Sequence, residues 1–280
     1  MAVTGKSLAD LSADDVVRLC EINFIDYWRC AGDSENAEFR EEHGVTFVLT
    51  GIQQDIFNLV LKMELEERDV ESAIDSVMQI LRSRKVPAIW HTGLTSSSRN
   101  IGKYLEARGY PHDYDLAAMA VDLGHVKDDF PRPDGLLVKE VRNTSDCEKW
   151  VECLAMSWDS PKQVVPWMMN NPCYNVGLRT RSGRKLPRKL YLATLDGKPV
   201  GTTMLNWTDE VAGLQKVGTL QSARNKGVGS ALIVAALRDA RALGFKLVVV
   251  LSTIEGVRLY SRIGFRTFGK FGEHSMHFER

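Results

Sequence analysis

A short glycine-bearing loop between two regular segments carries the clearest chemistry in the sequence. Gly227 and Gly229 stand in the stretch TLQSARNKGVGSAL, residues 219–232, where an apolar run gives way to a helical pattern. Glycine lets the backbone approach a ligand without an obstructing Cβ. The free N–H groups of a first helical turn, at the positive end of the helix dipole, then favour phosphate or pyrophosphate. Three neighbouring residues add positive charge or tolerate a positive φ, namely Arg224, Asn225 and Lys226, so the stretch indicates a site for a phosphate-bearing ligand.

Two common nucleotide-binding motifs do not fit this stretch. The P-loop requires GxxxxGK[ST], which occurs nowhere in the chain. The dinucleotide-binding pattern GxGxxG begins at Gly227 but meets Leu232 in place of its third glycine. The next apolar run ends in Leu251 and Ser252, without the acidic residue that would bind a ribose. Both motifs are therefore excluded.

The pattern that does fit is RxxGxG, formed by Arg224, Gly227 and Gly229. At this point the sequence resembles the GCN5-related N-acetyltransferase (GNAT) superfamily. The likeness extends over about 136–278 and is strongest over 214–269.

Two further segments carry the same resemblance. LYSRIGF, residues 259–265, is similar to the family's LYxxxGF helix and lies at the expected distance downstream. GLLVKEV, residues 135–141, is similar to its first strand. The resemblance implies an α/β (mixed α+β) fold, with a mixed, mostly antiparallel sheet flanked by helices, and acetyl-CoA as the co-substrate.

The resemblance also assigns the residues of an acetyl-CoA site. Val217, Gly218 and Thr219 would lie on a bulged strand whose backbone groups pair with the pantetheine arm, as an added strand would. A backbone N–H near Val217 would polarise the thioester oxygen. The pyrophosphate would be bound by the amides that follow, beside Arg224: Asn225, Lys226, Gly227, Val228, Gly229 and Ser230.

Acyl transfer to an amine needs an acid for the leaving thiolate and a route for the proton of the amine. The resemblance makes Tyr260 the acid, since a phenol stays protonated at neutral pH, and a core tyrosine is the alternative interpretation. The base is left open between ordered water and three carboxylates, Asp209, Glu210 and Glu255. Because no cysteine lies in the motif region, direct attack in a ternary complex is favoured over an acyl-enzyme.

Tryptophan and methionine gather in the two helical segments that would wall the acceptor cleft of a GNAT domain. Trp158, Trp167 and Met168 are the candidates to line a pocket for a partly apolar amine. Packing between helices, or against the first half of the chain, is the alternative. Histidine and cysteine show no ligand spacing, so no metal is expected.

The remaining elements follow from hydrophobic periodicity and turn residues. Helices are predicted at 12–30, 69–84, 99–108, 145–158, 164–169, 230–243 and 257–262. Strands are predicted at 45–50, 55–63, 86–90, 117–122, 136–141, 190–195, 199–206, 211–220, 247–251, 265–268 and 276–278.

The first half of the chain resembles a degenerate copy of the second. KYLEARGY, residues 103–110, matches RLYSRIGF, residues 258–265, in ending a helix with glycine and an aromatic residue. On that register Leu105 occupies the place of Tyr260, and the first half has no RxxGxG. We therefore expect the first copy to bind no cofactor and to be structural, roofing the acceptor cleft or forming a dimer surface.

A segment rich in proline and charge, residues 127–135, is typical of a linker. It predicts two tandem GNAT-like domains, at 1–126 and 134–280, with the acetyl-CoA site in the second.

Composition limits the class of protein. The chain has 280 residues, 36 basic and 36 acidic, so bulk electrostatics predicts neither a nucleic-acid nor a membrane-surface partner. Five cysteines without CxxC spacing disfavour a disulfide framework, and no run approaches the length of a membrane span. A cytoplasmic location is expected, with a homodimer left open.

These inferences converge on an N-acetyltransferase that moves an acetyl group from acetyl-CoA to a primary amine of a small molecule. Protein or peptide acetylation is the alternative within the enzyme class. A catalytically silent module that senses or binds coenzyme A is the alternative outside it.

Overall fold

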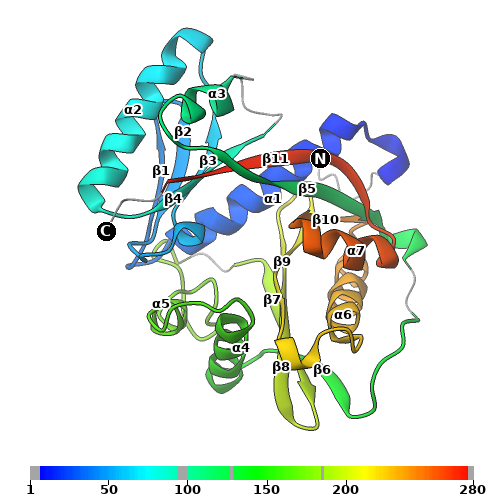
Figure 1. Ribbon diagram of the computed structural model, residues 1–280. Helices are drawn as coiled ribbons and strands as arrows, with labels where there is room; N and C mark the ends of the chain where they lie inside the picture. The colour runs from blue at the N-terminus through cyan, green and yellow to red at the C-terminus, as the bar shows by residue number, and fades with distance from the viewer. Residues whose placement is uncertain (1–6, 94–99, 127–128, 184–185, 277–280) are drawn as a thin grey trace.

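The computed structural model describes residues 7–93, 100–126, 129–183 and 186–276 (Figure 1). The strands are β1 (Glu38–Glu42), β2 (Val45–Leu49), β3 (Leu59–Met63), β4 (Ala88–Thr92), β5 (His112–Asp122), β6 (Leu136–Glu140), β7 (Arg188–Leu195), β8 (Lys198–Trp207), β9 (Ala212–Thr219), β10 (Leu247–Ser252) and β11 (Arg266–Met276). The α-helices are α1 (Ala13–Gly32), α2 (Glu67–Arg84), α3 (Ile101–Glu106), α4 (Thr144–Ser157), α5 (Val164–Met169), α6 (Val228–Ala242) and α7 (Ile254–Ile263).

All of these strands join in one mixed sheet in the order β1-β2-β3-β4-β11-β5-β10-β9-β8-β7-β6. Most neighbours are antiparallel, and the parallel pairs are β3 with β4 and β9 with β10. Helices flank the sheet, as the sequence predicts for its fold class. Within the described residues, no helix is both long and apolar enough to cross a bilayer.

The two halves of the chain exchange their last strands. β5, which ends the first half, pairs antiparallel with β10 of the second half from Leu247↔Asp122 to Ser252↔Ala117. β11, which ends the second half, lies between β5 and β4 and pairs antiparallel with both. The two halves therefore share a single sheet and not two separate ones.

The internal repeat proposed from the sequence has a structural counterpart. α3 and α7 both end in a glycine with positive φ, +83° at Gly109 and +119° at Gly264. The next residue closes the same hydrogen bond in each copy, Tyr110 N–H to the Leu105 carbonyl and Phe265 N–H to the Tyr260 carbonyl, both at 3.1 Å. This pairing confirms the register that places Leu105 opposite Tyr260.

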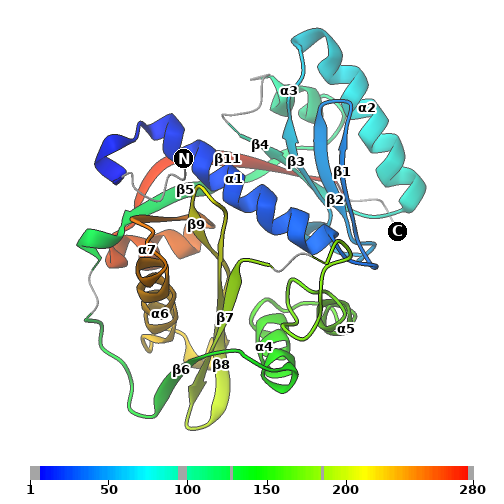
Figure 2. The ribbon, with the colours of Figure 1, turned by 180° about the vertical axis from the view of Figure 1, so that it is seen from behind.

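Two layers of helices cover the second half of the sheet. α6 and α7 lie on one face, and α4 and α5 lie on the other (Figure 1). α1 belongs to the first half but crosses the middle of the molecule, where it contacts β5, β9, β10 and β11 (Figure 2). Its start has a capping box, because the Ser12 hydroxyl accepts from Asp15 N–H at 3.1 Å and the Asp15 carboxylate accepts from Ser12 N–H at 3.0 Å.

Some predicted elements differ from the structure. The strand predicted at 55–63 is a 3₁₀ helix at Asp55–Phe57 followed by β3. The two terminal strands predicted at 265–268 and 276–278 are one strand, β11, whose register shifts between Thr267 and Gly269. Residues 277 and 278 lie outside the described residues. β1 was not predicted, because EFREE is a charged edge segment without apolar alternation.

Candidate active site

The gap between β9 and β10 is the first feature of the site. The two parallel strands share only two residue pairs, Val248↔Ala212 and Val249↔Gly213. Beyond Gly213 they diverge, so the edge of β9 that faces β10 has no partner strand among the described residues. An extended ligand can pair with such an edge as an added strand.

A β-bulge shapes this edge where the resemblance places the pantetheine arm. Thr202 pairs with Gly218 and Met204 with Gln215, so the single residue Thr203 opposes two residues of β9. Lys216, in the bulge, has φ of +53°. A bulge of this kind bends the strand and redirects the side chains and backbone groups beside it. Val217, Gly218 and Thr219 follow it to the end of β9.

The start of α6 provides the second feature. Gly227 is its N-cap residue with φ of +82°, and Asn225 has φ of +61°. The N–H groups of Val228, Gly229 and Ser230 have no acceptor within the described part of the chain. They are therefore free to bind an anion at the positive end of a 15-residue helix. We refer to these three amides as the anion site.

Close packing explains both glycines at this position. A Cβ on Gly227 would lie 2.4 Å from the carbonyl oxygen of Pro131, in the segment that precedes β6. A Cβ on Gly229 would lie 3.0 Å from the Leu259 side chain on α7. Gly227 has no room for a side chain, and its positive φ also disfavours one. At Gly229 a Cβ would require the Leu259 side chain to move slightly.

Arg224 supports the end of β9. Its Nε donates to the Thr219 carbonyl at 3.3 Å, and Nη2 lies 3.5 Å from the Ser157 carbonyl at the end of α4. The exposed guanidinium thus connects α4 to the strand end beside the anion site. Lys226 is exposed on the same loop.

Tyr260 lies on α7, which follows β10 on the far side of the gap. Its side chain is 5% exposed and packs edge-to-face against Phe265, with ring centroids 5.2 Å apart. Burial raises the pKa of the phenol, so the hydroxyl stays protonated at neutral pH. No residue in the described ranges forms a hydrogen bond with this hydroxyl.

The predicted acceptor residues separate into two groups. Trp167 donates Nε1–H to the Asn36 carbonyl at 3.2 Å and packs against Phe57 of the first half. Met168 is fully buried in the same apolar cluster. The alternative interpretation, packing against the first half, therefore describes both. Trp158 is only partly buried, and its ring faces the bulge in β9.

Sequence reasoning missed a buried lysine in the bulge. The Lys216 ammonium lies over four aromatic rings, 4.7 Å from the centroid of Trp158 and 5.0–5.7 Å from those of Trp28, Tyr27 and Phe57. We call these four rings and Lys216 the lysine cage. The available sequence signal was a lysine in the middle of a predicted strand, but its aromatic partners are distant along the chain.

The carboxylates considered as bases lie at the surface. Glu210 pairs with Arg18 at 3.3 Å, and both side chains are exposed. Glu255 is in the first turn of α7, where a backbone hydrogen bond lowers its pKa. Within the described residues, no group of three His, Cys, Asp or Glu side chains could hold a metal ion.

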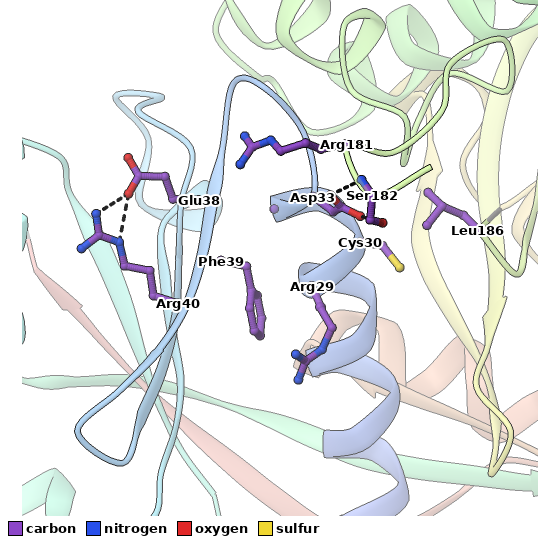
Figure 3. A pocket seen from close by; sticks show the side chains of 10 residues that line it. Arg29, Cys30, Asp33, Glu38, Phe39, Arg40, Arg181, Ser182 and Leu186 are labelled. Atoms are coloured by element: carbon purple, nitrogen blue, oxygen red, sulfur yellow. Dashed lines mark hydrogen bonds and ion pairs between the residues drawn. The ribbon is translucent and has the colours of Figure 1, made fainter. Parts of the chain in front are cut away.

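A surface pocket of about 460 Å³ lies away from these features, between the end of α1, β1 and the side chains of Arg181, Ser182 and Leu186 (Figure 3). Ion pairs join Arg29 to Glu41 at 2.7 Å and Arg40 to Glu38, and Asp33 accepts a hydrogen bond from the Ser182 hydroxyl at 2.5 Å. Arg181 also lines the pocket and donates to the Ser34 carbonyl.

A comparison of the sequence with models of known protein families finds one match. Residues 156–265, which include β9, the anion site and Tyr260, match the family model described as the acetyltransferase (GNAT) family. Residues 156–265 are similar to a GNAT domain. Members of that family transfer acetyl groups from acetyl-CoA, generally to small molecules or peptides.

Solved GNAT structures resemble nearly the whole chain. A GCN5-related N-acetyltransferase from Kribbella flavida is 15% identical with a TM-score of 0.66, over 94% of this chain and 96% of that one. A tandem GNAT protein from the clavulanic acid biosynthesis pathway is 13% identical with a TM-score of 0.61, over 95% and 96%.

A third match is part of a larger protein. The glucosamine N-acetyltransferase region of a fungal multi-domain GH3 β-N-acetylglucosaminidase is 14% identical with a TM-score of 0.59, over 95% of this chain and 37% of that one. At these identities the likeness shows the fold alone. No curated protein matches the sequence.

Proposed function

We propose that the chain is an acetyl-CoA-dependent N-acetyltransferase that acts on a primary amine of a small molecule, by direct attack in a ternary complex. The observation that carries this proposal is the free first turn of α6 beside the gap between β9 and β10, with Tyr260 on the opposite side. A diphosphate and an extended arm fit these two features together.

The residues present fit acetyl-CoA. The amides of residues 225–230 would bind the pyrophosphate, and the edge of β9 at Val217, Gly218 and Thr219 would bind the pantetheine arm. Arg224 would stabilise the strand end. When bound, acetyl-CoA supplies the thioester. Within this site the N–H of Val217 would polarise the thioester oxygen, and Tyr260 would protonate the leaving sulfur.

The first half of the chain does not fit the same ligand, and we propose that it binds none. α2 is the counterpart of α6, but its N-cap is Glu66 and its first turn carries Glu67 and Asp69. Carboxylates at this position would repel a pyrophosphate. The domain division at 1–126 and 134–280 then separates a supporting half from a catalytic half, joined by the shared sheet.

A small amine is favoured over a peptide because α1 covers the acceptor side of the sheet. Asn23 on α1 donates to the Asn206 carbonyl at 3.2 Å and accepts from Gln215 Nε2 at 3.2 Å, which fixes the helix over β8 and β9. A fixed cover leaves less room for an extended peptide. The fungal region with the same fold is described as a glucosamine N-acetyltransferase, which makes amino sugars the first acceptors to test.

Release of free coenzyme A tests this proposal. The protein would be incubated with acetyl-CoA and one of four amines: glucosamine, spermidine, tryptamine or a lysine-containing peptide. We expect thiol release that depends on one of the small amines and a matching acetylated product by mass spectrometry. Preferential release with the peptide would reject the small-molecule acceptor but not the transferase.

The second candidate is a silent module that binds coenzyme A. The observation that favours it is the burial of the acceptor side, where Trp28 and Phe57 from the first half are 2% and 0% exposed. Acetyl-CoA binding without acetylation of any amine would support this function and reject the transferase.

A further inference from the structure

The lysine cage lies directly beside the backbone that would bind the thioester. Lys216 immediately precedes Val217, and the bulge directs its side chain toward the face of the sheet covered by α1 and α4. Three elements contribute rings to the cage: α1 gives Tyr27 and Trp28, the 3₁₀ helix gives Phe57, and the end of α4 gives Trp158.

The charges around the Lys216 ammonium are few. Of the described residues, no carboxylate forms an ion pair with it. The titratable group that acts on it electrostatically is the Cys173 thiol. Tyr27 presents its ring to the ammonium, and its hydroxyl is hydrogen-bonded to the Tyr174 hydroxyl. Burial raises the pKa of Cys173 to about 11 and that of Tyr27 further, so both are neutral at pH 7.

Two opposing effects set the proton affinity of Lys216. Burial, at 8% exposure, disfavours the charged form and lowers its pKa to about 7. The four aromatic faces favour a cation and offset part of that lowering of the pKa. Both protonation states are therefore accessible near neutral pH, which is the condition for efficient proton exchange.

We infer that Lys216 is the general base of the transfer reaction, and that its cage holds the positive charge which the acceptor amine gives up. This inference rests on the proposed transferase function and names a base where sequence reasoning left one open. Neutral Lys216 would take one proton from the acceptor nitrogen and become an ammonium among the four rings.

The transfer balances with this assignment. The nitrogen lone pair of the neutral acceptor attacks the thioester carbon and forms the C–N bond. The extra proton on that nitrogen passes to the lone pair of Lys216 Nζ. The C–S bond then breaks, its electron pair goes to sulfur, and Tyr260 supplies the proton that completes the thiol. Solvent reprotonates Tyr260 and removes the proton from Lys216.

The cage gives this exchange a physical advantage. Attack by the neutral amine leaves one positive charge on its nitrogen, beside a site that stabilises one cation. Moving that proton to Lys216 keeps the charge within reach of the same rings and leaves the product amide neutral. A carboxylate base would not need the rings, and among the described residues none faces Lys216.

The protonation of Lys216 can be measured without turnover. The protein would be labelled with ¹³Cε-lysine, and the Lys216 signal would be identified by its loss in Lys216→Arg. We expect this signal to titrate near pH 7, well below the signals of exposed lysines such as Lys198. Titration of Lys216 together with the exposed lysines would overturn the inference.

Kinetics test the role in catalysis, using the fastest amine of the panel. We expect Lys216→Gln and Lys216→Arg to lower kcat by roughly 100-fold and to abolish the acid limb of the kcat/KM profile near pH 7. The affinity of both variants for acetyl-CoA, measured by calorimetry, should stay within a factor of about three of the wild-type value. Retained binding would show that the variants fold. Lys198 is an exposed lysine at the start of β8, and Lys198→Gln is the matched control that should behave as the wild type.

Three results would overturn the inference. One is an acid limb that persists in Lys216→Gln. Another is an acetyl group on Lys216 itself, found by peptide mass spectrometry, because the lysine would then be a nucleophile and not a base. The third is a wild-type protein that acetylates no amine, which would reject the proposed function as well. If the wild type is active and only the Lys216 variants lose activity, the proposed function stands.

Discussion

Burial of Lys216 beside the proposed thioester site also makes the free energy of unfolding depend on pH. Its pKa is lowered from 10.5 to about 7 by burial, so the folded protein releases this proton at a lower pH than the unfolded chain. Below pH 7 both states carry the charge and the full burial penalty applies. As pH rises from 7 toward 10.5, the folded state becomes neutral first and gains stability.

This linkage predicts the effect of Lys216→Met. We expect the variant to be more stable than the wild type by about 3–5 kcal/mol near pH 6, since it removes a buried charge. The difference should shrink steadily between pH 7 and pH 10. Urea denaturation at pH 6, 8 and 9.5 measures it. A difference that is the same at all three values would show that Lys216 does not change its pKa on folding.

Tyr260 should matter for turnover and not for binding. Tyr260→Phe removes the proton that the leaving sulfur needs, so we expect kcat to fall roughly 100-fold with acetyl-CoA affinity unchanged. Coenzyme A release and calorimetry measure the two quantities. Tyr104→Phe is the matched control, because the Tyr104 hydroxyl bonds Glu67 in the first half, far from the anion site. Equal losses in both variants would contradict a role for Tyr260 as the acid.

At the residue scale, local pattern predicted Gly227 and Gly229, because their roles follow from a helix terminus and its neighbours in sequence. The role of Tyr260 was predicted from the resemblance to the GNAT superfamily. Their ligand contacts stay predictions. Lys216 could not be identified in the same way. Its environment depends on Tyr27 and Phe57, which lie far away along the chain and reach it only through tertiary packing.

At the scale of elements, α6 allows a matched comparison of two glycines at its opposite ends. Gly227 has φ of +82° and no room for a Cβ, whereas Gly244 has φ of +92° and open space around it. We expect Gly244→Ala to lose roughly 1–2 kcal/mol of stability from the positive φ, and Gly227→Ala to lose more, because its Cβ would also clash with the Pro131 carbonyl. Only Gly227→Ala should weaken acetyl-CoA binding, by about 10-fold or more, because it displaces the backbone that forms the anion site.

Calorimetric titration of both variants with acetyl-CoA measures this difference. Equal affinities for the two would mean that the start of α6 is not the pyrophosphate site.

Helices and strands were predicted correctly where the local sequence alone determines the structure, through hydrophobic periodicity or turn residues. α5 was predicted at its observed bounds, Val164–Met169. The strands predicted at 190–195 and 199–206 form the β7–β8 hairpin, whose turn at Asp196-Gly197 has the two positive φ values, +51° and +77°, that a type I′ turn requires. Prediction failed for β1 and for residues 55–57. A charged edge strand and a single 3₁₀ turn have no periodicity of their own and are stabilised by what they pack against.

For the whole molecule, strand exchange should make unfolding cooperative. β5 lies between two strands of the second half, and β11 completes the sheet of the first half beside β4. Neither half can lose its fold without exposing a strand edge of the other. We expect one urea transition, coincident by tryptophan fluorescence and far-UV circular dichroism. Two separate transitions would indicate independently stable domains.

The exchange also marks the limit of sequence reasoning at this scale. The repeat and the linker predict two tandem copies, and the copies are recognisable in the paired ends of α3 and α7. Pairing of β5 with β10 could not be predicted, because each strand is apolar and compatible with its own half. Which strands pair over a long distance along the chain depends on the side chains that pack against both faces of the complete sheet.

Hydrogen–deuterium exchange in the presence of acetyl-CoA tests the central claim most directly. We expect new protection at residues 214–219 and 225–232, where β9 ends and α6 begins. Residues 64–70, at the equivalent start of α2, should exchange at an unchanged rate. Absence of protection at the start of α6, or protection at the start of α2 in its place, would contradict the assignment of the acetyl-CoA site to the second half.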